Sequence, residues 1–223
     1  AHITPADKKL YALRDVTATV DSFGLIASSI MSKKLAAGSD AIVLDVKVGD
    51  GAFMENHEDA SVLANLMVKI GNNAGRRTAA AITEMGQPLG KAVGNSIEVI
   101  EAIETLKGKG PSDITHLAEK LSGIMVYLGG KAKTPEEGME MTAAALRDGR
   151  GLAKFREFVR AQGGDPKVTE DYSVFPQHSL TKQLRAGEGG YVQKIEAKRI
   201  GLASQHTGAG RATKEDDIDL SAG

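Results

Sequence analysis

The chain has 223 residues, enough to bury a sizeable core as one large domain or two smaller ones. Its 28 Lys and Arg residues nearly balance 29 Asp and Glu, so with a net charge of −1 we expect neither nucleic acid nor a membrane surface as a partner. It has no cysteine, which excludes disulfides and thiolate chemistry and suits a reducing, cytoplasmic setting. No apolar run approaches the ~20 residues of a membrane span.

The first part of the chain predicts two helices. Pro5 follows Thr4 and suits the first position of a short helix, where its missing N–H costs little. A second helix is predicted from an N-cap at Asp21 or Ser22 to Gly38, a residue typical of helix C-termini.

A βαβ unit is predicted next. Residues 41–46 are almost continuously apolar, which is typical of a strand covered on both faces. A glycine turn at 49–51, a helix over 56–73 and a second apolar strand at 78–82 follow. Two strands joined through a helix favour a parallel pair with a right-handed crossover, so the fold class is α/β.

The remaining chain is predicted to be mostly helical. Segment 165–190 is rich in Pro, Gly and mixed charge and indicates a long loop or linker. A glycine-flanked strand at 191–195 and a short helix near 197–205 follow it. Before the loop we expect four helices, over 96–106, 112–128, 135–148 and 151–162.

One face of the second helix has a mixed apolar and polar character. Ile26, Ser29, Ile30 and Lys33 are spaced i, i+3, i+4 and i+7, within an arc of roughly 100°. Such a face suits a flat heterocycle, with isoleucines on the ring and the hydroxyl and ammonium groups on its carbonyl oxygens. An amphipathic helix whose lysine merely extends to solvent explains the same spacing.

Two further features also allow two interpretations. Tyr11 and Arg14 share a face of the first helix, where Arg14 could bind a planar acceptor or pair with Asp7 or Asp15 on the surface. The Gly49–Gly51 segment follows a strand, where ligands are expected, but an ordinary tight turn is equally compatible with it.

Longer motifs resemble one enzyme family over essentially the whole chain. Ordered runs rather than short patterns carry the resemblance: YALRDVTATVDS, SSIMSKKLAAGSDAIVLDVK, GAFM, QPLGKAVGNSIEVIEAI at 87–103, LKGKGPSD at 106–113 and GAGRATKEDDIDLSAG at 208–223. With these runs the chain resembles the pyrimidine-nucleoside phosphorylase/thymidine phosphorylase family.

The resemblance implies three groups of site residues. The pyrimidine base would be held by polar side chains that match Tyr11, Arg14, Ser29 and Lys33. An apolar wall around the base would be formed by Ile26, Ile30 and Phe53. Two backbone carbonyls and one carboxylate would form a monovalent-cation (potassium) site at Leu89, Ala92 and Glu101, of which Glu101 is otherwise an ordinary helix carboxylate.

The implied activity is reversible phosphorolysis of thymidine- or uridine-type nucleosides to base and (deoxy)ribose 1-phosphate. Inorganic phosphate is the co-substrate, and no organic cofactor is expected. Arg14 and Lys33 would act as the catalytic groups, by stabilising negative charge on the departing base. Two alternatives stay open: a phosphoribosyltransferase of related fold, although no diphosphate loop is visible, and a non-catalytic binding or assembly module.

The sequence also departs from the family pattern. No segment resembles the family's Lys-His-Ser-Thr-Gly-Gly phosphate loop, and family members continue beyond DLSAG. We therefore expect about half of a typical chain, inactive alone, with the missing N-terminal half as its partner. Phe23-Gly24 replaces the usual Ile-Pro. The histidines show no catalytic or metal-binding spacing and are expected at the surface: His2, His57, His116, His178 and His206.

Four domain segments follow by analogy with the family. Residues 1–36 would be part of a helical domain that forms a homodimer, and residues 37–165 an α/β domain with a largely parallel central sheet. Residues 166–189 would be a linker, and residues 190–223 the start of a C-terminal α/β subdomain.

Overall fold

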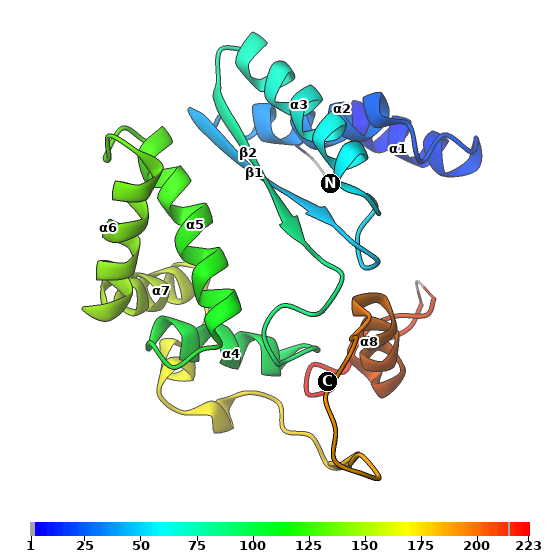
Figure 1. Ribbon diagram of the computed structural model, residues 1–223, viewed down its shortest axis with the longest axis vertical. Coiled ribbons are helices and arrows are strands. Elements are labelled where there is room, and N and C mark those ends of the chain that lie inside the picture. Colours follow the sequence, from blue (N-terminus) through cyan, green and yellow to red (C-terminus); the bar gives the residue numbers. More distant parts are fainter. Residues whose placement is uncertain (1–2, 214) are drawn as a thin grey trace. The chain divides into compact units, whose positions relative to one another are not determined.

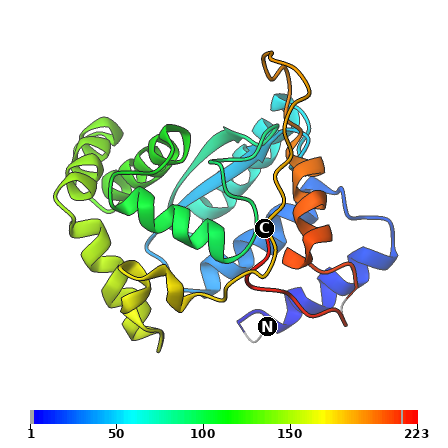
Figure 2. The ribbon, with the colours of Figure 1, turned by 90° about the horizontal axis from the view of Figure 1, so that it is seen from below.

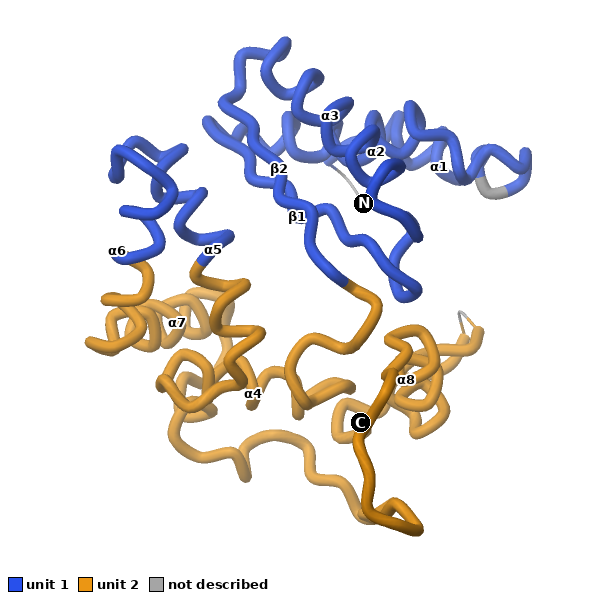
Figure 3. The backbone as a smooth tube through the Cα atoms, in the orientation of Figure 1, with its two compact units in different colours: residues 1–84, 120–140 blue, residues 85–119, 141–223 orange. Residues whose placement is uncertain are grey.

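The computed structural model describes residues 3–213 and 215–223. These residues form two compact units, each described here by itself (Figure 3). The first unit comprises Ala1–Glu84 and Lys120–Glu140, and the second comprises Met85–Glu119 and Met141–Gly223.

Two helices open the first unit, as predicted. Helix α1 spans Pro5–Val16, with Thr4 as N-cap and proline in the first turn. Helix α2 spans Phe23–Ala36, with Ser22 as N-cap. Gly38 has a φ of 78°, a left-handed conformation that glycine adopts without steric cost, and it ends the helix.

The predicted βαβ unit is confirmed. Strand β1 spans Ala41–Val48 and strand β2 spans Arg77–Glu84, and they pair in parallel from Ala41↔Arg77 to Val48↔Glu84 (Figure 1). Helix α3, His57–Asn73, connects them. Its N-cap Asn56 accepts a hydrogen bond from the Asp59 N–H at 2.9 Å, which satisfies one of the free donors of the first turn.

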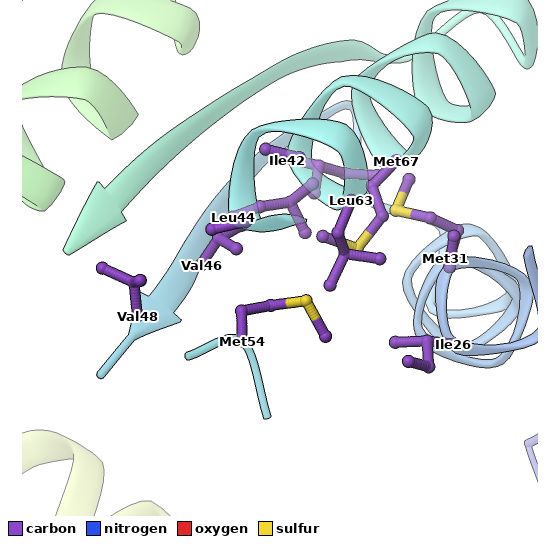
Figure 4. Close-up of a cluster of buried hydrophobic side chains, with 12 residues drawn as sticks. Ile26, Met31, Ile42, Leu44, Val46, Val48, Met54, Leu63 and Met67 are labelled. Atoms are coloured by element: carbon purple, nitrogen blue, oxygen red, sulfur yellow. The ribbon is translucent and has the colours of Figure 1, made fainter. Parts of the chain in front are cut away.

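The core of the first unit lies between β1 and helices α2 and α3 (Figure 4). Alternate residues of β1 point into it, because successive strand side chains face opposite ways. Met54, from the loop after β1, points toward the same cluster. The buried members are Ile26, Ala27, Met31, Ile42, Leu44, Val46, Val48, Met54, Ala60, Leu63, Ala64 and Met67.

The expectation that the first strand is covered on both faces is wrong. Asp45 is exposed, and the opposite face of the sheet is polar toward the carboxyl ends of the strands. Lys47 Nζ lies 2.6 Å from Asp45 Oδ2 and donates to Thr83 Oγ1 at 3.0 Å. Asp45 and Lys47 thus pair with each other on this face, so their charges are compensated without being covered by apolar side chains.

The second unit is mainly helical. Its own helices are α4, Ser96–Leu106; α7, Arg150–Ala161; and α8, Ala197–Ser204. Helices α5, Ser112–Leu128, and α6, Pro135–Arg147, contribute residues to both units. All five agree with the predicted helices to within a residue or two. Shorter turns of helix lie at Pro166–Thr169, Tyr172–Val174 and Gln205–Ala209.

The strand predicted at 191–195 is wrong. Residues 175–196 contain neither helix nor strand, so the predicted loop extends to α8 (Figure 1, Figure 2). Tyr191 is 100% exposed and Val192 is 77% exposed. Apolar composition alone does not form a strand, because its N–H and C=O groups need a neighbouring strand, and none pairs with them in the described part of the chain.

The α/β class is confirmed by this fold, while the predicted domain boundaries stay predictions. In residues 3–213 and 215–223, no helix combines the length and apolar character needed to cross a lipid bilayer.

Candidate functional site

Helices α1 and α2 bring four of the predicted site residues together. Tyr11 and Arg14 come from one helix, at i and i+3, while Ser29 and Lys33 come from the other, at i and i+4. The centroid of the Tyr11 ring lies 5.0 Å from Arg14 Cζ and 6.0 Å from Lys33 Nζ. Both distances are within the range of cation–π attraction.

Arg14 is buried, with 7% of its surface exposed. Its Nε atom has no hydrogen-bond partner. The alternative of a surface arginine paired with Asp7 is therefore wrong, and the side chain of Asp15, the other partner considered, lies outside the described residues. A buried guanidinium donor without an acceptor is costly in a folded protein, and a bound ligand can supply that acceptor.

Lys33 differs from Arg14 because every N–H donor of its ammonium group has an acceptor. Its Nζ atom donates to Ser29 Oγ at 2.8 Å and to the Ser29 carbonyl oxygen at 2.9 Å. It also lies 2.6 Å from Asp7 Oδ2, in an ion pair between the two helices.

Asp7 was not among the predicted site residues, although a signal for it exists. Asp7, Tyr11 and Arg14 are spaced i, i+4 and i+7, so they share one face of α1. The hydrogen bond from Lys33 is the main cause of a lowered pKa at the Asp7 carboxyl. A second hydrogen bond, from Ser29, and the charges of Lys33 and Arg14 act in the same direction, against the effect of burial. Asp7 is thus ionised at neutral pH.

A hollow of about 380 Å³ adjoins this cluster, within the usual range for small-molecule sites. Asp7, Tyr11 and Lys33 contribute to its wall, and the remaining lining residues are Ile3, Thr4 and Lys8. An anionic, an aromatic and a cationic side chain therefore meet at one concave surface of the first unit.

The three predicted apolar contacts lie elsewhere than this lining. Ile26 belongs to the buried core, and Ile30 is half-buried and packs against that core. Phe53 is 75% exposed on the loop after β1. That loop is a tight turn in which the Gly49 N–H donates to the Met54 carbonyl at 2.9 Å. Contact of these side chains with a base stays a prediction.

Two of the three predicted cation-site residues, Ala92 and Glu101, meet at a loop of the second unit, while a contact of Leu89 with them stays a prediction. Glu101 Oε1 accepts hydrogen bonds from the backbone N–H groups of Lys91, at 2.9 Å, and Ala92, at 3.2 Å. Asp113 Oδ2 accepts from the Gly90 N–H at 2.9 Å. This hydrogen bond is the main cause of a lowered pKa at the Asp113 carboxyl. Glu101 is therefore a loop-binding carboxylate rather than an ordinary exposed one.

This loop approaches the Glu101 carboxylate closely, and a monovalent cation at this place stays a prediction. Gly90 has a φ of 72°, and a Cβ atom there would lie 2.2 Å from Glu101 Oε2, so any larger residue requires the Glu101 carboxylate to move. Carboxylate and carbonyl oxygens are the ligands that hard cations prefer. The described residues contain no group of three or more His, Cys, Asp and Glu side chains placed to hold a metal ion.

The four histidines within the described residues contribute to neither cluster. Their surface position is confirmed, whereas His2 lies outside the described residues. The four exposed residues are His57, His116, His178 and His206.

Sequence comparison places this chain in a family. The family described as "Glycosyl transferase family, a/b domain" matches residues 1–152, which is more than half of the chain, so the chain belongs to it. A second family, "Pyrimidine nucleoside phosphorylase C-terminal domain", matches residues 191–223.

Individual relatives agree with the resemblance seen in the motifs. The chain is 55% identical to the pyrimidine-nucleoside phosphorylase of Staphylococcus aureus (strain USA300) over 222 residues. It is 57% identical to that of Geobacillus stearothermophilus over the same length. Each alignment covers 100% of this chain and 51% of the relative, so the chain spans about half the length of the curated relatives that it matches.

Proposed function

We propose that this chain carries the pyrimidine-binding part of a pyrimidine-nucleoside phosphorylase. The observation that carries the proposal is the buried Arg14 guanidinium with its unpartnered Nε, beside Tyr11 and Lys33. Leaving such a donor unsatisfied costs about 1–3 kcal/mol. Arg14 is enclosed and does not line the hollow, so we assign the missing acceptor to a carbonyl oxygen of uracil or thymine that reaches Arg14 when its side chain moves. Relatives that bear the phosphorylase name support this choice of ligand.

The reaction then assigns a role to each cation. An oxygen of inorganic phosphate forms a bond to C1′ of the nucleoside, while the C1′–N1 bond breaks and its electron pair passes to the pyrimidine. Negative charge therefore develops on the base and its carbonyl oxygens. Arg14 and Lys33 stabilise that charge electrostatically, and neither needs to transfer a proton or form a covalent bond.

Binding of the co-substrate phosphate is assigned to residues other than these 223. No segment of this sequence resembles the family's phosphate loop, so we propose that the 223-residue polypeptide alone does not phosphorolyse nucleosides. The whole protein is proposed to act as a homodimer. Leu89, Ala92 and Glu101 would hold a potassium ion that steadies the 89–92 loop and takes no direct part in bond breaking.

The test is phosphate-dependent release of thymine from thymidine and of uracil from uridine by the whole protein, with Arg14→Ala alongside. We expect release by the wild type only when phosphate is present. Binding of phosphoribosyl diphosphate without phosphorolysis would favour a phosphoribosyltransferase instead. Self-association without any affinity for thymine or uracil would favour a binding or assembly module.

A separate assay tests the 223-residue polypeptide. We expect no phosphate-dependent release of base from thymidine or uridine at any protein concentration. Release of base by this polypeptide would refute the assignment of phosphate binding to residues outside it.

A further inference from the structure

The Lys33 ammonium has no hydrogen left for a ligand. An ammonium group offers three N–H donors. Its three acceptors are Ser29 Oγ, the Ser29 carbonyl oxygen and Asp7 Oδ2, at 2.8, 2.9 and 2.6 Å. A carbonyl oxygen of a base can bind Lys33 only if one of these acceptors leaves.

Asp7 is the acceptor that can leave. Both Ser29 oxygens belong to the helix of Lys33 itself, four residues earlier, and stay with it. Asp7 comes from the other helix and lines the hollow. Its carboxylate meets Lys33 and Ser29 from α2, while Arg14 acts on it from α1, and Tyr11 and Lys8 line the same hollow.

We propose that Asp7 is an internal competitor for Lys33, whose carboxylate occupies the position that a pyrimidine carbonyl oxygen takes when the base binds. Asp7 is then a positioning residue that keeps the ammonium in place and sets the affinity of the site. This inference rests on the proposed function, because it assumes that the base binds at this cluster.

The exposure of the pair suits such an exchange. The Lys33 side chain is 51% exposed and that of Asp7 is 12% exposed. Water reaches the lysine end of this pair, where an exposed ion pair changes an equilibrium constant by up to about fivefold. A ligand oxygen that arrives on that side can replace the mostly buried carboxylate, which keeps its hydrogen bond from Ser29. The Arg14 Nε–H, in contrast, has no internal partner to give up.

The first experiment is calorimetric binding of thymine and of uracil to the whole protein at pH 7, comparing the wild type with Asp7→Asn. The amide lacks the charge that attracts Lys33, so we expect the dissociation constant to fall about three- to fivefold. Asp7→Glu restores a carboxylate and should return affinity toward that of the wild type.

Asp40→Asn is the matched control for the change in net charge. Asp40 is fully exposed and pairs only loosely, at 3.8 Å, with Arg76. We expect no change in affinity for this variant. Equal or weaker binding of the base by Asp7→Asn would overturn the inference.

A second measurement needs no variant. The carboxyl carbon of Asp7, followed by ¹³C NMR, should show a low pKa in the free protein and a pKa closer to the ordinary value when thymine is bound, because Lys33 has turned to the base. Thymine binding that leaves the pKa of Asp7 unchanged would refute the inference and leave the proposed function intact. Failure of both wild type and Asp7→Asn to bind thymine or uracil would refute the proposed function itself.

Discussion

Charged side chains have opposite uses in two regions of the molecule. One is the α1–α2 cluster, formed by Asp7, Tyr11, Arg14, Ser29 and Lys33, and the other is the 89–92 loop. In the loop, Glu101 and Asp113 accept backbone N–H groups, so their charges hold the chain in place. In the α1–α2 cluster, buried Arg14 keeps a donor without a partner. Charge alone therefore does not identify a ligand site. What distinguishes the two regions is a hydrogen-bond donor that stays without an acceptor after folding, the Arg14 Nε–H.

The largest effect is expected at Arg14. Arg14→Ala removes a donor directed at charge that forms on the base, so kcat/KM for phosphorolysis by the whole protein should fall about 100- to 1000-fold. Affinity for free neutral thymine should fall much less, because the charge develops mainly in the transition state. Steady-state kinetics and calorimetry measure the two quantities.

Arg76→Ala is the control for this substitution. It removes the same side chain from a position that pairs with Asp40 rather than with the cluster. Its kinetics should match those of the wild type. Equal losses of kcat/KM and of thymine affinity in Arg14→Ala would show that Arg14 binds the base without stabilising the transition state.

The next largest effect is expected for a substitution of Gly90 in the 89–92 loop. Gly90 and Gly75 have nearly the same backbone, with φ of 72° and 73°. A Cβ atom at Gly90 meets Glu101, whereas one at Gly75 has no atom within 4 Å. Both alanine variants carry left-handed strain of about 1–2 kcal/mol.

Gly90→Ala should therefore lower the free energy of unfolding by about 1–2 kcal/mol more than Gly75→Ala does, because the Glu101 carboxylate must move and lose hydrogen bonds from Lys91 and Ala92. Urea unfolding measures the difference. Similar losses in the two variants would mean that the loop does not close on Glu101.

A smaller effect is expected for the loop carboxylates. Glu101→Gln keeps an oxygen acceptor but loses its charge, which should cost about 1 kcal/mol of unfolding free energy. Glu98→Gln is the matched comparison, since Glu98 Oε1 accepts only one N–H, from Gly94 at 2.9 Å. Urea unfolding should show the larger loss in Glu101→Gln, and the reverse order would contradict the assignment.

The smallest effect is the pH dependence of the contribution from Asp113. A carboxyl whose pKa is lowered by folding stabilises the protein above its unfolded value, about 3.9, and this contribution is lost as pH falls through the folded value. Because Asp113 is exposed, we expect only a few tenths of a kcal/mol between wild type and Asp113→Asn at pH 7. The difference should vanish at pH 2–3 in urea unfolding, and a difference that persists there would exclude charge as its cause.

Much of the fold was predictable because its signals are local. Pro5, Gly38 and the N-cap Asn56 mark helix ends through backbone chemistry that involves only neighbouring residues. The strand expected at 191–195 depended instead on a partner strand, which no local pattern reveals. The polar face around Asp45 could not be predicted either, because it depends on the pairing with β2 that places Thr83 beside Asp45 and Lys47.

The site was predictable in part for the same reason. Spacing placed Tyr11 with Arg14, and Ser29 with Lys33, since each pair belongs to one helix. The meeting of the two helices, and hence the bond from Lys33 to Asp7, depends on their packing. Burial of Arg14 is likewise a tertiary property. Its spacing alone favoured a surface ion pair.

The loop that carries Phe53 has a consequence for ligand binding. Val48 bridges to Met54, the Gly49 N–H is bonded to the Met54 carbonyl at 2.9 Å, and the Met54 side chain is anchored in the core. Restricting the backbone of one residue costs about 1–2 kcal/mol of conformational entropy, and in this loop the restriction already occurs when the protein folds. A molecule that packs against the exposed Phe53 ring therefore meets a backbone that is already restrained at both ends of the loop, so the freedom lost on binding is mainly that of the Phe53 side chain.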